Sequence, residues 1–468
     1  MHQPAVAAPA QPPASLIVGL LTSVVAIAFE TVAVATAMPE AARQLGRLDL
    51  YAWTFSLFVI AMALSTVLAG RWCDRHGPVR ALQAALALFG MGLVLATLAP
   101  SMQVLLVARF IQGFGGGAFN VALMVVVAQV FAPGARAKIM TAFSVCWVLP
   151  AFIAPPIAAW LTHHLSWHWV FASMLPAVLL TAVLTHAPLR RLRAATVPDQ
   201  TGESDPVPLW AAFVATLGVA LIQFAGQRLD RWSPPLLAAG LVCLGLSLPR
   251  LMAPGFFRFA PGIATISWTR ALQAGTFFAV EAFLPLSLVT IRGLSLFMAG
   301  LTLTVGSLGW TIGSWVQARE WLMLRRDQVI QVGVLCSFLG MATIVASTAL
   351  GWPAWTVGLG WTIGGLGMGL GMASTTLAMM SLSSPAQIGR NTSSLQVAEA
   401  LGTSLFTGLA GAIHANLRVG HSSVTTFSSV FGLMLALAVL GLLVSLRMGR
   451  VPNLVSGAGA QPSDMMER

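Results

Sequence analysis

The stretch ALQAALALFGMGLVLATLA, residues 81–99, decides the fold class, because no charged side chain interrupts it. A helix needs about 20 such residues to cross the hydrocarbon layer of a bilayer, which is roughly 30 Å thick. A strand of a membrane barrel alternates polar and apolar residues, and this stretch does not. Because a backbone inside lipid must satisfy its own hydrogen bonds, the stretch predicts a membrane-spanning α-helix.

Stretches of the same kind recur along the whole chain. Hydrophobic residues make up 57% of the 468 residues and charged residues only 8%, which is too little charge to cover a soluble protein. Helix breakers such as Pro39, Pro100 and Pro188 are predicted to end or separate spans. The pattern predicts an all-α, polytopic membrane protein with fourteen spans, at 15–38, 51–69, 80–98, 103–131, 137–161, 167–187, 208–226, 233–250, 262–290, 295–318, 328–350, 354–383, 392–416 and 422–446.

The distribution of arginine predicts the orientation. Most of the 25 Lys and Arg residues fall in loops on one side, whereas the loops of the other side hold only Arg43, Arg47, Arg228, Arg231, Arg292 and Arg418. The basic side is expected to be cytoplasmic, and both termini lie on it. The net charge of +11 is therefore attributed to topology and to contact with anionic lipids, and no basic segment interleaved with aromatic residues indicates nucleic-acid binding.

A weak internal repeat indicates two halves. AGRWCDR after the second span is echoed by IGSWVQARE after the tenth, with Gly313 matching Gly70 and Trp315 matching Trp72. The glycines of GWTIGGLGMGLG, residues 360–371, likewise echo those of the fourth span. Parallel repeats of this kind predict two six-helix bundles. The predicted domains are a disordered cytoplasmic tail 1–14, an N-terminal bundle 15–187, a cytoplasmic linker 188–207, an inserted helix pair 208–250, a C-terminal bundle 262–446 and a disordered cytoplasmic tail 451–468.

Ionisable residues within the spans are the first candidates for function. An arginine inside a span costs about 2.5–3.5 kcal/mol on insertion scales, and in-span acids are also unfavourable, so such residues should face the protein interior. Burial disfavours the charged form of a carboxyl, which suits a group that loads and releases a proton. A structural hydrogen-bonding role is the alternative for each acid, and a structural ion pair or a snorkelling cation is the alternative for the arginine of the fourth span. The predicted proton-coupling residues are Glu30, Glu281, Arg109 and Glu399.

Polar and aromatic residues near these groups are candidates for a substrate cavity. Gln112 and Gly116 lie on the same helical face as Arg109, Phe277 and Phe278 lie one turn before Glu281, and packing or lipid contact is the alternative for the aromatic residues. The predicted cavity residues are Gln112, Asn120, Phe277, Phe278 and Gln396.

The loop GRWCDRHGPVR, residues 70–80, is a candidate cytoplasmic gate. Gly70 is expected to allow close helix packing, Gly77 begins the turn, and the charged residues are Asp74, Arg75 and Arg80. These charges either cap a helix end or form a latch in which Asp74 pairs with the other half of the protein.

Three motifs carry a resemblance to the major facilitator superfamily. The loop resembles its signature Gly-x3-Asp-Arg-x-Gly-x2-Arg, although Pro78 and Val79 replace the usual basic residues. RFIQGFGGGAFN in the fourth span is similar to the signature Arg-x2-Gln-Gly-x-Gly, which is associated with proton coupling. PAFIAPPIAAW in the fifth span resembles the antiporter signature Gly-x3-Gly-Pro-x2-Gly-Gly. In that helix Pro155 is retained and Pro156 follows it, but Pro150 and alanines replace the glycines.

The resemblance implies a fourteen-helix drug:proton antiporter, with a major facilitator fold of two six-helix bundles plus two inserted helices. FETVAVATAMP, residues 29–39, is similar to the first helix of that branch, with Glu30 where the branch has Asp. Such a protein exports hydrophobic or cationic small molecules by alternating access. It would act as a monomer in a bacterial inner membrane, with a small-molecule substrate, protons and lipids as partners and with no cofactor.

Two other functions stay open. The altered fifth-span motif is compatible with an uptake symporter or a facilitator for a small metabolite, and a non-transporting membrane receptor is the third possibility. No paired nucleophile and base, Walker-type loop or metal-ligand spacing occurs in the sequence, so we expect neither an enzyme nor a metal site.

Overall fold

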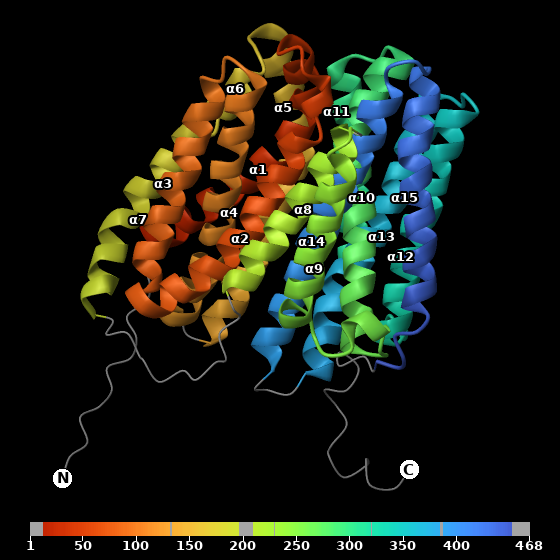
Figure 1. Cartoon of the computed structure of the whole chain (residues 1–468). Coiled ribbons are helices and arrows are strands. Elements are labelled where there is room, and N and C mark those ends of the chain that lie inside the picture. The colour runs from red at the N-terminus through yellow and green to blue at the C-terminus, as the bar shows by residue number, and fades with distance from the viewer. Residues whose placement is uncertain are drawn as a thin grey trace, which may run out of the picture. The chain divides into compact units, whose positions relative to one another are not determined.

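The computed structural model describes residues 13–131, 133–195, 209–228, 230–319, 321–383 and 387–451. Side chains of some residues within these helices, including Asp74, lie outside the description. The chain divides into two compact units, Met1–Thr216 and Leu217–Arg468, with the boundary inside one helix. Within each unit, long helices run side by side (Figure 1).

The first unit is built from long helices joined by short turns. α6 and α7 together occupy the predicted sixth span, which is therefore broken by a turn rather than continuous. The helices of this unit are α1 (Ala14–Gln44), η1 (Leu48–Leu50), α2 (Trp53–His76), α3 (Pro78–Thr97), α4 (Met102–Val130), α5 (Pro133–His164), α6 (His168–Ala172) and α7 (Leu175–Ala195), and α8 (Leu209–Arg228) begins in it.

The second unit repeats the order of long helices. Its helices are α9 (Ser233–Leu251), η2 (Phe256–Arg258), α10 (Ile263–Arg292), α11 (Leu296–Gln317), α12 (Arg326–Ala349), α13 (Ala354–Leu382), α14 (Ile388–Leu417) and α15 (Ser423–Ser445). The pairing also repeats, because α4 packs against α2 and α3 as α13 packs against α11 and α12, and α1 contacts α5 as α10 contacts α14. This repetition is what two related six-helix bundles would show.

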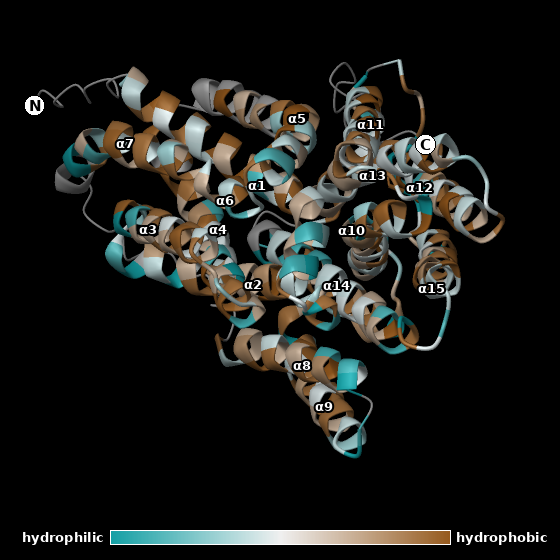
Figure 2. Ribbon diagram, turned by 90° about the horizontal axis from the view of Figure 1, so that it is seen from above, coloured by the Kyte–Doolittle hydropathy of each residue, from teal (hydrophilic) through white to brown (hydrophobic). Residues whose placement is uncertain are grey.

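Twelve helices of the described residues are long and apolar enough to cross a membrane. Brown, hydrophobic ribbon dominates them in Figure 2. The fold prediction is therefore confirmed as an all-α, multi-pass membrane protein, whereas the count of fourteen spans is confirmed only for twelve. The other two predicted spans correspond to α5 and α14, which are helices of 32 and 30 residues. α14 carries Asn391, Gln396 and Glu399, which lower its mean hydropathy.

Glycines of α4 set the close packing of the first unit. A Cβ atom added at Gly113 or Gly117 would collide with the backbone carbonyls of Phe58 and Met62 in α2. One added at Gly115 would collide with the backbone of Phe89 in α3. These glycines therefore allow α2 and α3 to pack closely against α4, and no larger side chain fits without moving a helix.

α13 has the equivalent glycines in the second unit. Added Cβ atoms at Gly365 and Gly369 would meet the carbonyls of Gly306 and Trp310 in α11, with the same spacing of four residues as in α4. The sequence echo between these two glycine-rich helices thus corresponds to real packing.

The sequence match of Gly70 with Gly313 is not reproduced in the packing. Gly313 lies against the Leu366 carbonyl of α13, but a Cβ at Gly70 would meet nothing within 4 Å among the described residues. The expected role of Gly70 in close helix packing is therefore wrong. The residue of α2 that corresponds to Gly313 is Ser65. A Cβ at Gly117 would meet Met62 and Ser65, just as a Cβ at Gly369 would meet Trp310 and Gly313.

The inserted helices α8 and α9 pack on each other and on α14. A Cβ at Gly218 in α8 would lie 2.9 Å from the Gly240 carbonyl of α9. Asn416 of α14 donates a hydrogen bond of 3.0 Å to the Gly226 carbonyl of α8. The three helices lie side by side in Figures 1 and 2.

Two prolines do not end helices as the sequence predicts. α1 continues through Pro39 to Gln44, and α7 continues through Pro188 to Ala195, so the start of the predicted linker is helical. Each proline removes one backbone hydrogen bond, and burial of Ala41, Ala42 and Leu189 offsets that loss. The rest of the predicted linker and nearly all of both tails lie outside the described residues.

Candidate functional site

A buried ion pair lies in the interior of the first unit. Glu30 is in the middle of α1 and Arg109 is in α4, and their side chains are 1% and 3% exposed. Arg109 Nη1 donates to Glu30 Oε1. The arginine predicted within a span therefore has a carboxylate partner from another helix, which lowers the cost of burying its charge.

Arg109 is also held by groups other than Glu30. Its Nε donates to the Thr54 carbonyl over 2.9 Å, and its Nη1 donates to Gln112 Oε1 over 2.8 Å. Its guanidinium carbon lies 4.3 Å from the centre of the Phe58 ring, a cation–π contact. If Glu30 takes up a proton, Arg109 keeps these three contacts, so the site can change charge without leaving the arginine unsupported.

Two polar atoms of this cluster are left over. Glu30 Oε2 and Gln112 Nε2 are buried and make no hydrogen bond to the described residues. A buried polar atom without a partner costs about 1–3 kcal/mol, so such atoms mark places where a proton, a water molecule or a substrate group can bind. The cluster therefore offers two buried polar atoms to which a proton, a water molecule or a substrate group can bind.

An aromatic cluster occupies the interior of the second unit. Phe277 of α10 stacks on Trp361 of α13, with ring centres 4.2 Å apart, and lies edge-on to Trp310 of α11 at 5.7 Å. Phe278 lies 6.3 Å from Trp310. Three helices thus contribute rings to one cluster, and electron-rich ring faces attract both apolar groups and cations.

Glu281 lies one turn beyond this cluster on α10. It follows Phe277 by four residues and Phe278 by three, so the three side chains are neighbours on the helix surface. Its side chain is only partly buried, and it forms no ion pair within the described part of the chain. A carboxyl beside aromatic rings and without a cationic partner is a suitable site for a proton or an organic cation.

The third in-span acid is paired. Glu399 Oε2 of α14 accepts a hydrogen bond of 2.9 Å from Arg270 Nε of α10. Arg270 also donates to Thr375 Oγ1 over 2.6 Å and to the Met372 carbonyl, both in α13. Arg270 therefore joins three helices, an arrangement that favours a structural role for Glu399 over a role in binding protons. Gln396, one turn away, is exposed.

The ion pair and the aromatic stack occupy equivalent places in the repeat. Arg109 precedes Gly113 by four residues, and Trp361 precedes Gly365 by four, where the two glycines make matching contacts. Each side chain reaches the first helix of its own bundle, Arg109 to Glu30 and Trp361 to Phe277. One position is thus charged in the first unit and aromatic in the second.

The other predicted site residues lie as follows. Gly77 has φ +82° and joins α2 to α3, as its predicted turn requires. Arg75, Arg80 and Asn120 are exposed. The side chain of Asp74 lies outside the described residues, so the predicted latch stays a prediction. The prolines of the antiporter motif all lie inside α5, namely Pro150, Pro155 and Pro156.

Sequence reasoning missed Arg270, Trp310 and Trp361 as members of these clusters. A count of charges could have found the first, because two in-span arginines can neutralise only two of the three in-span acids. That count leaves one acid without a partner, and the structure identifies it as Glu281. No comparable signal marks the two tryptophans among the 15 in the sequence.

Comparison with known proteins places this arrangement in a family. The model of the Major Facilitator Superfamily matches residues 19–407. Multidrug resistance protein 3 of Bacillus subtilis (strain 168) is 25% identical over 419 residues, covering 86% of this chain and 80% of the relative. The multidrug efflux pump SdrM of Staphylococcus aureus (strain N315) is 22% identical over 401 residues, covering 85% and 89%.

Solved structures share the fold. A D-xylose-proton symporter superposes with a TM-score of 0.65 at 16% identity, covering 95% of this chain and 99% of the other. A POT family transporter in complex with a thioalcohol-conjugated peptide gives 0.68 at 14% identity, covering 93% and 96%. The chain therefore belongs to the major facilitator superfamily. It is a multi-pass secondary transporter of a small-molecule substrate rather than an enzyme, as predicted.

Proposed function

We propose that this protein exports hydrophobic, cationic small molecules in exchange for protons. The observation that carries the proposal is Glu281, an in-span carboxyl without a cationic partner among the described residues, one turn from a cluster of four aromatic rings. The names of two relatives, a multidrug resistance protein and a multidrug efflux pump, support export of drug-like molecules. In this proposal, a proton and a cationic substrate compete for Glu281.

Glu30 is the second proposed proton site. Its carboxylate holds Arg109 when ionised, and the Thr54 carbonyl, Gln112 and Phe58 hold Arg109 when Glu30 is protonated. Protonation would therefore release α1 from α4 at this point without unfolding the unit. In this proposal, release of that contact triggers the alternating-access motion of the transporter.

The driving force is adequate for such an exchange. One elementary charge crossing 100 mV supplies about 2.3 kcal/mol. An exchange of two protons, one carried by Glu281 and one by Glu30, for one monovalent cation moves one net charge, and at about 1.4 kcal/mol per tenfold change it sustains a substrate gradient of roughly fiftyfold. A pH gradient of the right sign would add to this, so no other source of energy is needed.

The proposed setting is a bacterial inner membrane. We propose that α5 and α14 also cross it, which gives fourteen spans and places both termini in the cytoplasm, where the basic loops face anionic lipid. The protein would act as a monomer, and Arg75, Gly77 and Arg80, with Asp74, would contribute to a gate on that side.

Reconstitution into liposomes with an imposed pH gradient tests the proposal. A fluorescent cationic dye should move against the proton flux with the wild-type protein, and Glu281→Gln should abolish this coupling. Glu40→Gln is the matched control, because Glu40 lies at the end of α1 and is already paired with Arg43. Full coupling in Glu281→Gln, or dye movement unaffected by the gradient, would overturn the proposal.

Proton-coupled or facilitated uptake of a metabolite is the second candidate function. Its support is the altered antiporter motif of α5, where Ala154 and Ala158 are buried at positions that the motif reserves for glycine. Accumulation of a sugar or peptide in the same liposomes, with no effect on the dye, would favour this function over export.

A further inference from the structure

We propose that the groove between α3 and α7 binds one acyl chain of an anionic phospholipid. The groove has a volume of about 600 Å³, within the range of ligand pockets, and lies entirely in the first unit. None of the residues discussed above as proton or substrate sites lines it, so it is a separate site. The inference does not rest on the direction or the substrate of transport.

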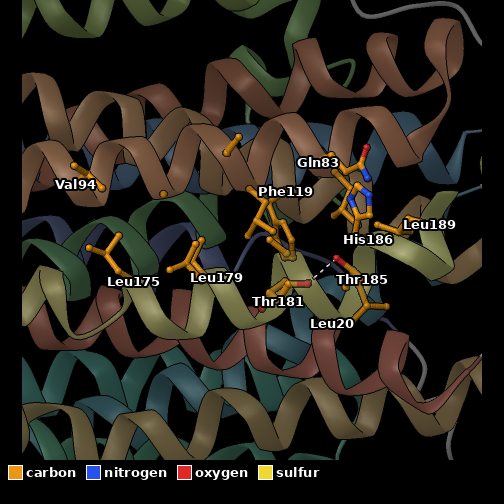
Figure 3. Close-up of a pocket in the computed structure, with 16 residues that line it drawn as sticks. Leu20, Gln83, Val94, Phe119, Leu175, Leu179, Thr181, Thr185, His186 and Leu189 are labelled. Carbon is orange, nitrogen blue, oxygen red and sulfur yellow. Dashed lines mark hydrogen bonds between the residues drawn. The ribbon is translucent and has the colours of Figure 1, made fainter.

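The groove has the length of an acyl chain in one leaflet. One wall is a stripe of α3 from Gln83 to Val94, which are eleven residues apart. At 1.5 Å per residue this stripe is about 16 Å long, close to half of the roughly 30 Å hydrocarbon layer. The opposite wall is the stripe of α7 that contains Leu175, Leu179 and Ala182 (Figure 3).

Away from the end that holds Gln83 and His186, the walls and floor of the groove are mostly apolar. Leu20 of α1 and Phe119 of α4 are fully buried beneath it. The two threonines that line it donate to backbone carbonyls, Thr181 to Gly19 over 3.2 Å and Thr185 to Thr181 over 2.7 Å. Because both hydroxyl protons are already hydrogen-bonded within the protein, this part of the groove favours a hydrocarbon chain over a polar ligand.

One end of the groove is polar. Gln83 and His186 lie together at the end opposite Val94 and Leu175 (Figure 3). Neither side chain hydrogen-bonds to the part of the chain that the structure describes. An amide and an imidazole at the mouth of an apolar trough can bind the ester and phosphate oxygens of a lipid.

The charge at this mouth selects an anionic headgroup. Arg80 precedes Gln83 by three residues and Arg190 follows His186 by four, so each extends its stripe by one turn, and both are exposed. None of the described residues that line the groove is acidic. Two arginines around the polar end of an acyl-sized trough fit the phosphate of a lipid such as phosphatidylglycerol.

Native mass spectrometry of protein taken from liposomes tests this site. The liposomes should contain equal amounts of phosphatidylglycerol and phosphatidylcholine. One phosphatidylglycerol should remain bound to the wild-type protein. Arg80→Gln combined with Arg190→Gln should weaken that binding about thirtyfold, because the two arginines together contribute twice the attraction of a single arginine to an anionic membrane surface. Arg447→Gln, which removes an exposed arginine beyond α15, is the charge control and should bind normally.

A second variant separates the trough from the charges. Ala87→Trp fills the groove from an exposed position of α3 and should also displace the lipid, whereas Leu443→Trp on the exposed face of α15 should not. Elution of each variant as a monodisperse peak shows that it folds. Equal retention of both lipids, unchanged binding in either groove variant, or displacement of the lipid by a transported dye would overturn the inference.

Discussion

The buried pair of Glu30 and Arg109 predicts unequal effects of removing its two members. Arg109→Met leaves Glu30 with no described partner, since the other carboxylate oxygen makes no hydrogen bond. Loss of one partner of a buried ion pair costs about 3–5 kcal/mol. Glu30→Gln instead leaves Arg109 on the Thr54 carbonyl, Gln112 and the Phe58 ring, and the new amide oxygen can still accept. Its cost should resemble one charged hydrogen bond, about 1.5–3 kcal/mol.

Unfolding of purified protein in mixed micelles by increasing SDS measures both costs. Arg109→Met should unfold first, Glu30→Gln second and the wild type last. The double variant should be more stable than Arg109→Met alone, because no buried charge is left. A Glu30→Gln variant that is as unstable as Arg109→Met would refute the reasoning, since it would mean that the other three contacts do not support the arginine.

Three further results are expected. Gly113→Leu should destabilise the first bundle by more than about 1–3 kcal/mol, the usual cost of overpacking, because its Cβ would meet the backbone of α2. Gly70→Leu should leave the unfolding midpoint unchanged in the same SDS titration, because a Cβ there meets none of the described residues. Arg270→Met should lower the unfolding midpoint by more than Thr375→Val, since the arginine joins three helices and the threonine provides one bond; equal midpoints would contradict this. Trp310→Ala should raise the KM for a cationic dye about fivefold, through loss of a cation–π contact worth about 1 kcal/mol, with no change for a neutral substrate.

The fold followed from hydropathy to within a few residues at most helix ends. Apolar length is enough to place a membrane helix, because lipid imposes one thickness on all of them. The exceptions arise where packing overrides local signals. Pro39 and Pro188 lie inside helices, because burial of the residues that follow them offsets the backbone hydrogen bond that each proline removes.

The candidate site was only half predictable. Glu30, Arg109 and Glu281 are conspicuous in the sequence, because charge in an apolar helix is rare. Their partners depend on how each helix is rotated, which a nearly uniform apolar sequence does not encode. Trp361 therefore looks like any other tryptophan until its helix is seen to face Phe277.

The alignment of the two halves of the internal repeat was also only partly predictable from the sequence. The sequences of the two loops align Gly70 with Gly313, whereas the contacts between helices align Ser65 with Gly313. The positions of tight helix contacts therefore define the register of this repeat better than the motifs at the helix ends do.

The exchange of Arg109 for Trp361 at matching positions has a consequence for how the two halves diverged. Both pairs, one ionic and one aromatic, bridge the first and fourth helices of a bundle at equivalent positions of the repeat. A duplicated ancestor could therefore keep its helix packing while this one position became charged in the first copy and aromatic in the second. A substitution at this position can thus change the chemistry inside one bundle while the glycine contacts one turn away keep the helices in place.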